Sequence, residues 1–295
     1  MLIVVDQLSH IYAPGTPLSR RALRGVSLCI SPGERLGVAG PTGSGKSTLM
    51  QHLAGLLEPS TGRVLLDGVP ASGRGREGRE RRRRLGIAFQ YPEEQVFENT
   101  VAREVAFGPR NLGLNREAVD ARVRWALELV GLEPLRVLDR SPFTLSGGEL
   151  RRVSLAGVIA LQPEVLILDE PTAGLDPQGR DTLLKRIDAW QRDTGSTLVI
   201  VSHDLAALAQ LADRSLILQG GEIVADGPSA MVLSDVAQLT AAGMEPPPSV
   251  SLLHQLRAGG WDIRIDRVLP SEAAAEIAAF LALHPPSSDT QGAPS

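Results

Sequence analysis

The chain has 295 residues, of which 43% are hydrophobic and 22% charged, and its formal net charge is −4. An apolar fraction of this size supports a folded core and excludes a wholly disordered chain. The negative charge argues against a generally basic nucleic-acid binder. The length exceeds one average domain without clearly reaching two, so we expect one dominant domain with an appendage.

Two further counts restrict the class of protein. Among 30 basic residues only Lys46 and Lys185 are lysines, which makes the position of each informative. The single cysteine, Cys29, cannot form an intrachain disulfide, and the chain is typical of a cytosolic protein. It has no apolar run long enough to span a membrane, and its N-terminus does not resemble a signal peptide. We therefore expect any membrane role to come through a partner.

The predicted elements are short apolar strands, joined at first by loops and later by helices. In chain order they are strands at 2–8, 26–30 and 34–39, a helix ending near 57, strands at 63–66 and 85–90, helices at 117–130 and 148–161, a strand at 165–168, a helix at 179–194, a strand at 197–201, a helix at 205–211, and a hairpin over 215–218 and 222–225. This alternation indicates an α/β fold whose mostly parallel sheet is covered on both faces. Because the early strands lack intervening helices, an antiparallel piece is expected beside that sheet.

Two segments have an unusual composition. Residues 73–84 hold seven arginines and two glutamates without an aromatic residue, which favours a solvated loop and helix start over a nucleic-acid patch. Composition changes again after Gly227, where a helix-prone stretch leads to three prolines at 246–248 and then to a small segment over 250–283. Residues 284–295 are rich in proline and serine and are expected to form a disordered tail.

A glycine-rich phosphate loop is the strongest functional signal. Gly40, Gly45, Lys46 and Ser47 match the pattern G-x-x-x-x-G-K-S between an apolar strand and a helix, which is the context that this motif requires. The glycines let backbone N–H groups turn toward phosphate oxygens. Lys46 would reach the β- and γ-phosphates of ATP, and the Ser47 hydroxyl would coordinate Mg²⁺. The predicted phosphate-binding residues are Gly40, Pro41, Thr42, Gly43, Ser44, Gly45, Lys46, Ser47 and Thr48.

Two adjacent carboxylates follow the strand predicted at 165–168. Asp169 and Glu170 would emerge at its C-terminal end, where ligands bind in parallel sheets. Asp169 is predicted to hold Mg²⁺, and Glu170 to polarise the attacking water as general base. Together with the phosphate loop upstream, the pair predicts nucleotide hydrolysis.

A third motif narrows the class of nucleotide hydrolase. It precedes the helix predicted at 148–161 and consists of Leu145, Ser146, Gly147, Gly148 and Glu149. A hydroxyl and small-residue amides at a helix N-terminus form a second phosphate site. Two phosphate sites on different surfaces of one chain suggest that two chains sandwich each nucleotide. By itself, Ser-Gly-Gly would also fit a helix-entry loop.

With these motifs in this order, residues 2–228 resemble the ATP-binding subunit of an ABC transporter. The resemblance implies a P-loop NTPase (RecA-like) core with an antiparallel β subdomain, which makes an ATPase domain of residues 1–228. It also implies a helical subdomain over about 91–160 that carries the Leu-Ser-Gly-Gly-Glu signature. Residues 229–283 would then be a small C-terminal domain, ahead of the tail.

The same resemblance implies roles for further residues. Tyr12 matches the aromatic residue that stacks on adenine, and Gln90 matches the glutamine that senses Mg²⁺ and the γ-phosphate. Asp176 belongs to the match for the loop that communicates across the dimer, and His203 matches the switch histidine at the γ-phosphate. Glu149 stands where many members have glutamine, so a carboxylate would lie near the partner's nucleotide, a charge that a helix N-terminus tolerates.

A narrower resemblance, to the ATPases of energy-coupling factor (ECF) transporters, is carried by the sequences at 14–17, 89–97 and 105–111. These transporters import vitamins or transition-metal ions such as cobalt and nickel. The resemblance implies a second ATPase subunit, either a paralogue or an identical chain, with residues 229–283 helping to hold the dimer. It places the chain peripherally, at the cytoplasmic face of the cell membrane.

The membrane partners follow from the ECF resemblance as well. The coupling helices of a transmembrane T subunit would bind at Glu93, Glu94 and Gln95, where acidic side chains can pair with arginines. A substrate-binding membrane S subunit would be contacted indirectly, and no nucleic acid is expected as a partner. Without the resemblance, these residues would read as a solvated acidic turn.

Three alternatives stay open on the sequence. One is the ATPase of a conventional ABC transporter, which the C-terminal segment and the Pro-Glu-Glu-Gln run disfavour. Another is a soluble ABC-type ATPase acting on nucleic acid or ribosomes, and the third is a regulatory nucleotide-binding protein without catalysis. Because Glu170 and His203 are both present, the third is disfavoured. The transported substrate cannot be read from this chain.

Overall fold

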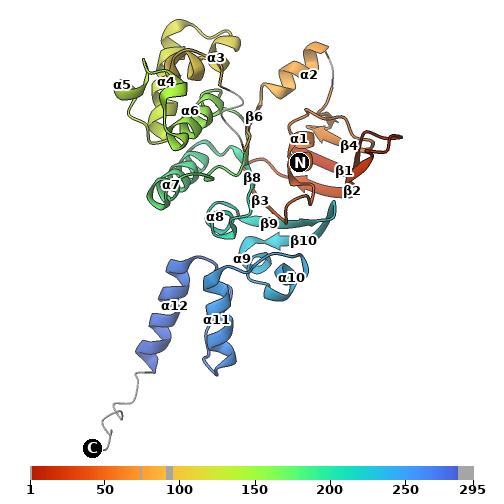
Figure 1. The fold of residues 1–295 in the computed structure, drawn as a ribbon, viewed down its shortest axis with the longest axis vertical. Coiled ribbons are helices and arrows are strands. Elements are labelled where there is room, and N and C mark those ends of the chain that lie inside the picture. Colours follow the sequence, from red (N-terminus) through yellow and green to blue (C-terminus); the bar gives the residue numbers. More distant parts are fainter. Residues whose placement is uncertain (1, 74, 91–95, 285–295) are drawn as a thin grey trace, which may run out of the picture.

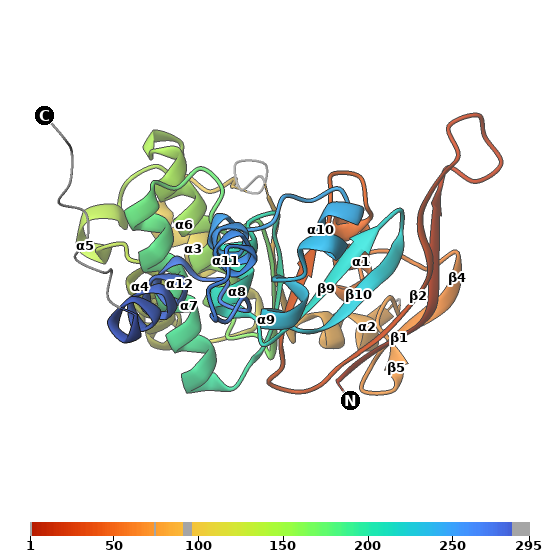
Figure 2. The same cartoon turned by 90° about the horizontal axis from the view of Figure 1, so that it is seen from below.

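Residues 2–73, 75–90 and 96–284 are described by a computed structural model of the chain. Over these ranges no helix has both the length and the apolar character needed to cross a bilayer. Figures 1 and 2 agree in placing the helices of residues 101–159 on one side of the molecule and the antiparallel strands of residues 3–70 on the other.

The central sheet has six strands in the order β10-β9-β3-β8-β7-β6. Their bounds are β3 Arg35–Ala39, β6 Leu85–Ala88, β7 Val165–Asp169, β8 Thr197–Val201, β9 Arg214–Gln219 and β10 Glu222–Pro228. β10 is antiparallel to β9, and every other neighbouring pair is parallel. All residues of β7 and β8 are buried, as expected of parallel strands covered on both faces. The predicted α/β fold is confirmed.

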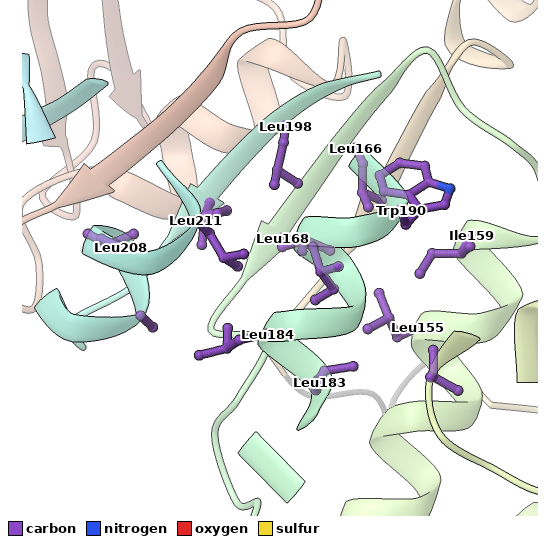
Figure 3. Packing of buried hydrophobic residues seen from close by; sticks show 14 of the residues in the cluster. Leu155, Ile159, Leu166, Leu168, Leu183, Leu184, Trp190, Leu198, Leu208 and Leu211 are labelled. Atoms are coloured by element: carbon purple, nitrogen blue, oxygen red, sulfur yellow. The ribbon is translucent and has the colours of Figure 1, made fainter. Parts of the chain in front are cut away.

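Two layers of helices cover this sheet. Their bounds are α1 Lys46–Leu53, α6 Gly147–Ile159, α7 Pro177–Thr194 and α8 Leu205–Leu211. Alternate residues of a strand point to opposite faces, so Leu166 and Leu168 pack with α6, α7 and α8, as Figure 3 shows. Val165 and Ile167 pack on the other face with α1. Because β3, β8 and β7 are parallel neighbours, their carboxyl ends lie at the same edge of the sheet.

A second sheet, of order β2-β1-β4-β5, is antiparallel throughout. It consists of β1 Ile3–Tyr12, β2 Arg20–Ile30, β4 Thr61–Leu66 and β5 Val69–Pro70. β1 and β2 are longer than the strands predicted at 2–8 and 26–30. Register shifts along their pairing, with Gln7 at φ 48°, break the period-2 pattern that marks a strand in sequence.

The helical subdomain contains α3 Val101–Asn111, α4 Arg116–Leu129, α5 Pro134–Val137, the 3₁₀ turn η2 Pro142–Thr144 and α6. Thr100 and Asn115 cap α3 and α4 by accepting hydrogen bonds from backbone N–H groups. The sequence pattern did not predict α3, which contains Pro109. Within the arginine-rich stretch, Gly75–Arg82 forms α2, in line with the expected helix start.

Four helices follow the central sheet: α9 Ser229–Val232, α10 Val236–Ala241, α11 Pro248–Ala258 and α12 Pro270–Leu283. α9 and α10 contribute Val232, Leu233 and Leu239 to the main core. α11 and α12 extend away from it, as Figure 1 shows, around a separate small cluster. Packing thus joins α9 and α10 to the ATPase core, whereas composition placed a boundary near 228. Of the predicted tail, residues 285–295 lie outside the described ranges.

Candidate active site

The phosphate loop connects β3 to α1 at the edge of the central sheet. Gly40 has φ 150°, and a Cβ at this position would lie 2.2 Å from the carbonyl oxygen of Leu218, so only glycine fits. Lys46 Nζ donates hydrogen bonds to the carbonyl oxygens of Gly40, at 2.7 Å, and Pro41, at 3.0 Å. Burial lowers the pKa of Lys46, and the nearby charges of Glu170 and Asp169 oppose that shift. The loop is therefore closed around its own lysine, next to two carboxylates.

Asp169 is the last residue of β7, and it is buried. Burial and the neighbouring charge of Glu170 raise the pKa of Asp169 to about 6, against the opposing effect of Lys46. The Ser47 hydroxyl lies 3.5 Å from Asp169 Oδ2. A hydroxyl and a carboxylate this close supply the hard oxygen ligands that Mg²⁺ prefers, so the residues fit that ion.

Glu170 is held by three hydrogen bonds in a left-handed backbone conformation, with φ 50°. Its Oε2 accepts from the Ser202 hydroxyl at 2.8 Å, and its Oε1 accepts from the backbone N–H of His203 at 2.8 Å. His203 Nδ1 lies 2.7 Å from the same Oε1. A carboxylate offers about four lone-pair sites, so these contacts occupy Oε1 and leave one site on Oε2. Ser202 was not predicted, because a lone serine after a strand carries no recognisable pattern.

One pocket of about 730 Å³ contains most of the residues predicted to bind phosphate or Mg²⁺ or to catalyse hydrolysis. Its lining residues are Gly40, Pro41, Thr42, Gly43, Lys46, Ser47, Gln90, Asp169, Glu170, His203, Gly243, Met244 and Glu245. The last three follow α10 and were not predicted, since the Glu-Pro-Pro-Pro sequence read only as a break. The C-terminal segment therefore reaches the same pocket as the phosphate loop.

Tyr12 lies beside the phosphate loop, in a smaller pocket of about 150 Å³ that also contains Gly45, Lys46 and Arg20. Its hydroxyl is 3.2 Å from Thr48 Oγ1, and the residue is 39% exposed. Tyr12 is therefore partly accessible beside the phosphate loop. Arg20 was not predicted, because nothing in the sequence distinguishes it from its arginine neighbours.

The signature residues 145–149 form the N-terminus of α6. Ser146 is the N-cap and makes a capping box with Glu149: Ser146 Oγ accepts from the Glu149 N–H, and Glu149 Oε2 accepts from the Ser146 N–H at 3.0 Å. Glu149 also lies 3.5 Å from Arg140, and the hydrogen bond from the Ser146 N–H lowers its pKa. Among the described residues, none of 145–149 lines the pocket of the phosphate loop.

Gln90 and Asp176 occupy loops near the carboxylate strand. Arg151 of α6 donates to the carbonyl oxygens of Gln90 and Ala173, both at 2.8 Å, and so joins the two loops. Asp176 is the N-cap of α7, where its Oδ1 accepts from the Gly179 N–H at 2.6 Å. Glu93, Glu94 and Gln95 lie outside the described residues.

A phosphate loop, two carboxylates at the end of the adjoining strand and a separate serine-capped signature helix define an ATP-binding cassette. In agreement, the family model described as ABC transporter matches residues 23–173. A TM-score of 0.71 relates the chain to cbiO1 of Clostridium perfringens, part of an ABC transporter complex, at 34% identity over 86% of this chain and 98% of that one. A dimeric ATP-binding cassette bound to ADP and phosphate matches with the same TM-score at 26% identity, over 77% of this chain and 99% of that one.

Curated relatives give a finer assignment. The chain is 51% identical to the ECF transporter ATP-binding protein EcfA2 of Symbiobacterium thermophilum, over 96% of this chain and 97% of the relative. It is 44% identical to EcfA2 of Clostridium perfringens, over 89% and 92% of the two chains. The chain therefore belongs to the ABC transporter family and, within it, to the ATP-binding subunits of ECF transporters.

Proposed function

We propose that this chain hydrolyses ATP as a subunit of an ECF-type importer, and that it couples ATP-driven dimer closure to uptake of a vitamin or transition-metal ion. The observation that carries the proposal is the Glu170 carboxylate, fixed by Ser202 and His203 in the same pocket as Lys46. A base held in a fixed orientation beside a phosphate-binding lysine is what hydrolysis requires and what mere nucleotide binding does not.

In this proposal the phosphate-loop amides and Lys46 bind the β- and γ-phosphates of ATP. Ser47, Asp169 and Gln90 would hold Mg²⁺, which supplies neutralisation of phosphate charge when it is bound. The face of Tyr12 would stack on adenine, since the residue is partly accessible beside the loop.

Glu170 acts as general base toward the attacking water. Its free lone-pair site is on Oε2, so the water would donate there while the Ser202 hydroxyl keeps the carboxylate in place. His203 donates through Nδ1 to Oε1 because a carboxylate oxygen can only accept. The imidazole is 75% exposed, which leaves Nε2 available to the γ-phosphate.

A second ATPase subunit completes the site. The signature residues lie outside the chain's own phosphate pocket, which supports their binding the nucleotide of a partner. Ser146 and the N-terminal amides of α6 would contact that γ-phosphate, and the loop ending at Asp176 would communicate between the subunits. Hydrolysis then removes the γ-phosphate contacts that favour the closed dimer.

Transmembrane subunits would receive this motion at the segment that follows Gln90. Glu93, Glu94 and Gln95 are proposed to bind the coupling helices of a T subunit at the cytoplasmic face of the membrane. Two positions after Gln95 in the sequence, Phe97 forms an exposed edge-to-face pair with Phe107. Their centroids are 4.8 Å apart, an apolar contact of the kind that interfaces use. A pull-down of the chain with a T subunit, with a conventional ABC permease as the control, tests this partner assignment.

The central experiment replaces Glu170 with glutamine and measures ATPase turnover in the assembled transporter. We expect turnover to fall about 100-fold or more, because the general base is lost, with ATP binding retained. The matched control is Glu222→Gln, an exposed glutamate on β10, which should keep wild-type turnover. Near-normal hydrolysis by Glu170→Gln would refute the role of Glu170.

A further inference from the structure

We propose that Arg20 is a second cationic contact for the nucleotide, and that it binds the phosphates shared by ATP and ADP opposite the phosphate loop. This inference rests on the proposed function, since it concerns the same nucleotide. It assigns a binding role to a residue that no motif includes.

Arg20 is positioned by the antiparallel sheet. It is the first residue of β2 and pairs directly with Tyr12 of β1 in the register of the two strands. Residues directly opposite each other in such a pair project from the same face of the sheet. Arg20 and Tyr12 accordingly line one pocket, together with Ala22, two positions further along β2.

The guanidinium lies directly over the phosphate loop. Arg20 Nη2 is 3.2 Å from the point that a Cβ would occupy at Gly43, a residue with φ +79°. Lys46 lines the same pocket. An anion in this pocket would therefore be near two cations, Arg20 and Lys46.

Among the described residues, no acidic side chain pairs with Arg20. None of the residues lining this pocket is acidic. The ion pairs found within the described residues engage other arginines, such as Arg84 and Arg214, and none of them includes Arg20. An unpaired guanidinium beside a phosphate-binding loop has a free fork of donors, the group best suited to bidentate phosphate contacts.

The two pockets beside the loop indicate which phosphates Arg20 would contact. Gln90, Asp169, Glu170 and His203 line the larger pocket, where the γ-phosphate would react, and none of them lines the smaller one. Arg20 lies in the smaller pocket with the residue proposed to stack on adenine. It is therefore on the base side of the loop, next to phosphates that ADP retains.

The test compares Arg20→Ala with Arg21→Ala by titration calorimetry of the purified full-length chain with ATP and with ADP. Arg21 is the neighbouring residue on β2, pairs with Ile11 and projects from the opposite face, so it is a matched control. We expect Arg20→Ala to weaken both nucleotides about 10-fold, which is the order for a charged hydrogen bond, with an unchanged ATP-to-ADP ratio. Arg21→Ala should stay within about twofold of wild type.

Two further measurements separate phosphate binding from other roles. Pyrophosphate should compete for the site about 10-fold less well in Arg20→Ala, and Arg20→Lys should recover part of the loss because it keeps the charge. Undiminished binding of ADP, a loss confined to ATP, or unchanged pyrophosphate competition would each overturn the proposal. These results differ from a failure of the proposed function, in which the wild-type chain binds nucleotide but Glu170→Gln hydrolyses it normally. If Arg20→Ala does not fold, Arg20→Gln replaces it in the same titrations.

Discussion

Asp169 and Glu170 are adjacent carboxylates with opposite local environments. Both side chains are buried, but Glu170 accepts three hydrogen bonds, whereas within the described residues Asp169 accepts one, from Ser47 at 3.5 Å. The pKa of Asp169 is correspondingly raised to about 6, chiefly by burial. The pair thus contains one carboxylate stabilised by the protein and one whose charge is left for a ligand to neutralise.

Removing the charge of Asp169 should stabilise the nucleotide-free protein. The folded pKa of about 6 exceeds the ordinary 3.8, so the folded state binds the proton more tightly than the unfolded state does. The ionised carboxylate therefore destabilises the folded protein, and this loss of stability develops as pH rises from about 4 to about 6. We expect Asp169→Asn to be more stable than wild type by about 3 kcal/mol at pH 8. Urea unfolding between pH 4 and pH 8 should show the difference growing up to about pH 6 and then staying constant.

The control for this pH series is Asp139→Asn, in an exposed turn before the signature, which should keep the wild-type pH dependence. An equal stability difference between Asp169→Asn and wild type at pH 4 and pH 8 would contradict the assignment. So would a difference that shrinks as pH rises.

At the residue scale, the sequence predicted those site residues whose function depends on local chain geometry. The phosphate loop and the Asp169–Glu170 pair each lie within one strand and the turn after it, so their spacing is visible in sequence. Three further residues reach the site only through tertiary packing. Arg20 lines the smaller pocket, Met244 lines the larger one, and Ser202 contacts the Glu170 carboxylate. No spacing rule links such residues to the motif they approach, and they could not be predicted.

Among the elements, α6 shows why its N-terminus carries glutamate. The Glu149 carboxylate accepts a hydrogen bond from the Ser146 backbone N–H and completes a capping box. Glu149 therefore has a structural role at the start of this helix. Glutamine also completes such a box, because its side-chain oxygen can accept the same hydrogen bond. The geometry of the helix end therefore gives residue 149 a capping role that either side chain can perform.

Substitutions at Glu149 should follow this capping role. Glu149→Ala removes one half of the box and is expected to lower the free energy of unfolding by about 1 kcal/mol. Glu149→Gln should cost less than about 0.5 kcal/mol, because it retains the cap and loses only favourable charge interactions at the helix end. Chemical denaturation of the two variants and wild type is the measurement. Equal losses in both would mean that charge, and not capping, determines the effect.

Arg151 connects α6 to two functional loops. Its guanidinium donates to the carbonyl oxygens of Gln90 and Ala173, so that a shift of α6 would move both loops together. We expect Arg151→Lys to lower ATPase turnover about 10-fold while leaving ATP affinity within twofold, since a single ammonium cannot reproduce the planar fork. Arg124→Ala, an exposed residue on α4, is the control and should not change turnover. A proportional loss of ATP binding in Arg151→Lys would instead indicate a damaged phosphate site.

Across the whole molecule, the alternation of strands and helices predicted the central sheet, and the early strands without helices predicted the antiparallel sheet. The helices α3 and α9 to α12 were not delimited in advance. α3 contains a glycine and a proline near its end, and α9 and α10 are too short to show a periodic pattern. Their positions depend on packing against larger elements, which a local pattern does not encode. The predicted division at residue 228 follows composition and remains a prediction.

The pair α11 and α12 should be less stable than the central sheet. Its own cluster contains three buried hydrophobic residues, Leu253, Ile263 and Ala273, whereas β7 and β8 are buried along their whole length. Hydrogen exchange of the isolated chain should therefore show amides of α11 and α12 opening at a lower free energy than those of β7 and β8. Equal protection of the two regions would contradict this expectation. Assembly with a second subunit that covers these helices should slow their exchange.

Residues 243–245 connect the weakly packed C-terminal helices to the pocket of the phosphate loop. They lead from α10 to α11 and, at the same time, form part of the wall of the phosphate pocket. Any partner that binds α11 and α12 and displaces these residues changes the affinity for nucleotide. By thermodynamic reciprocity, nucleotide then changes the affinity for that partner by the same factor. Association through the C-terminal helices, where it displaces residues 243–245, would then be thermodynamically linked to occupancy of the ATP site.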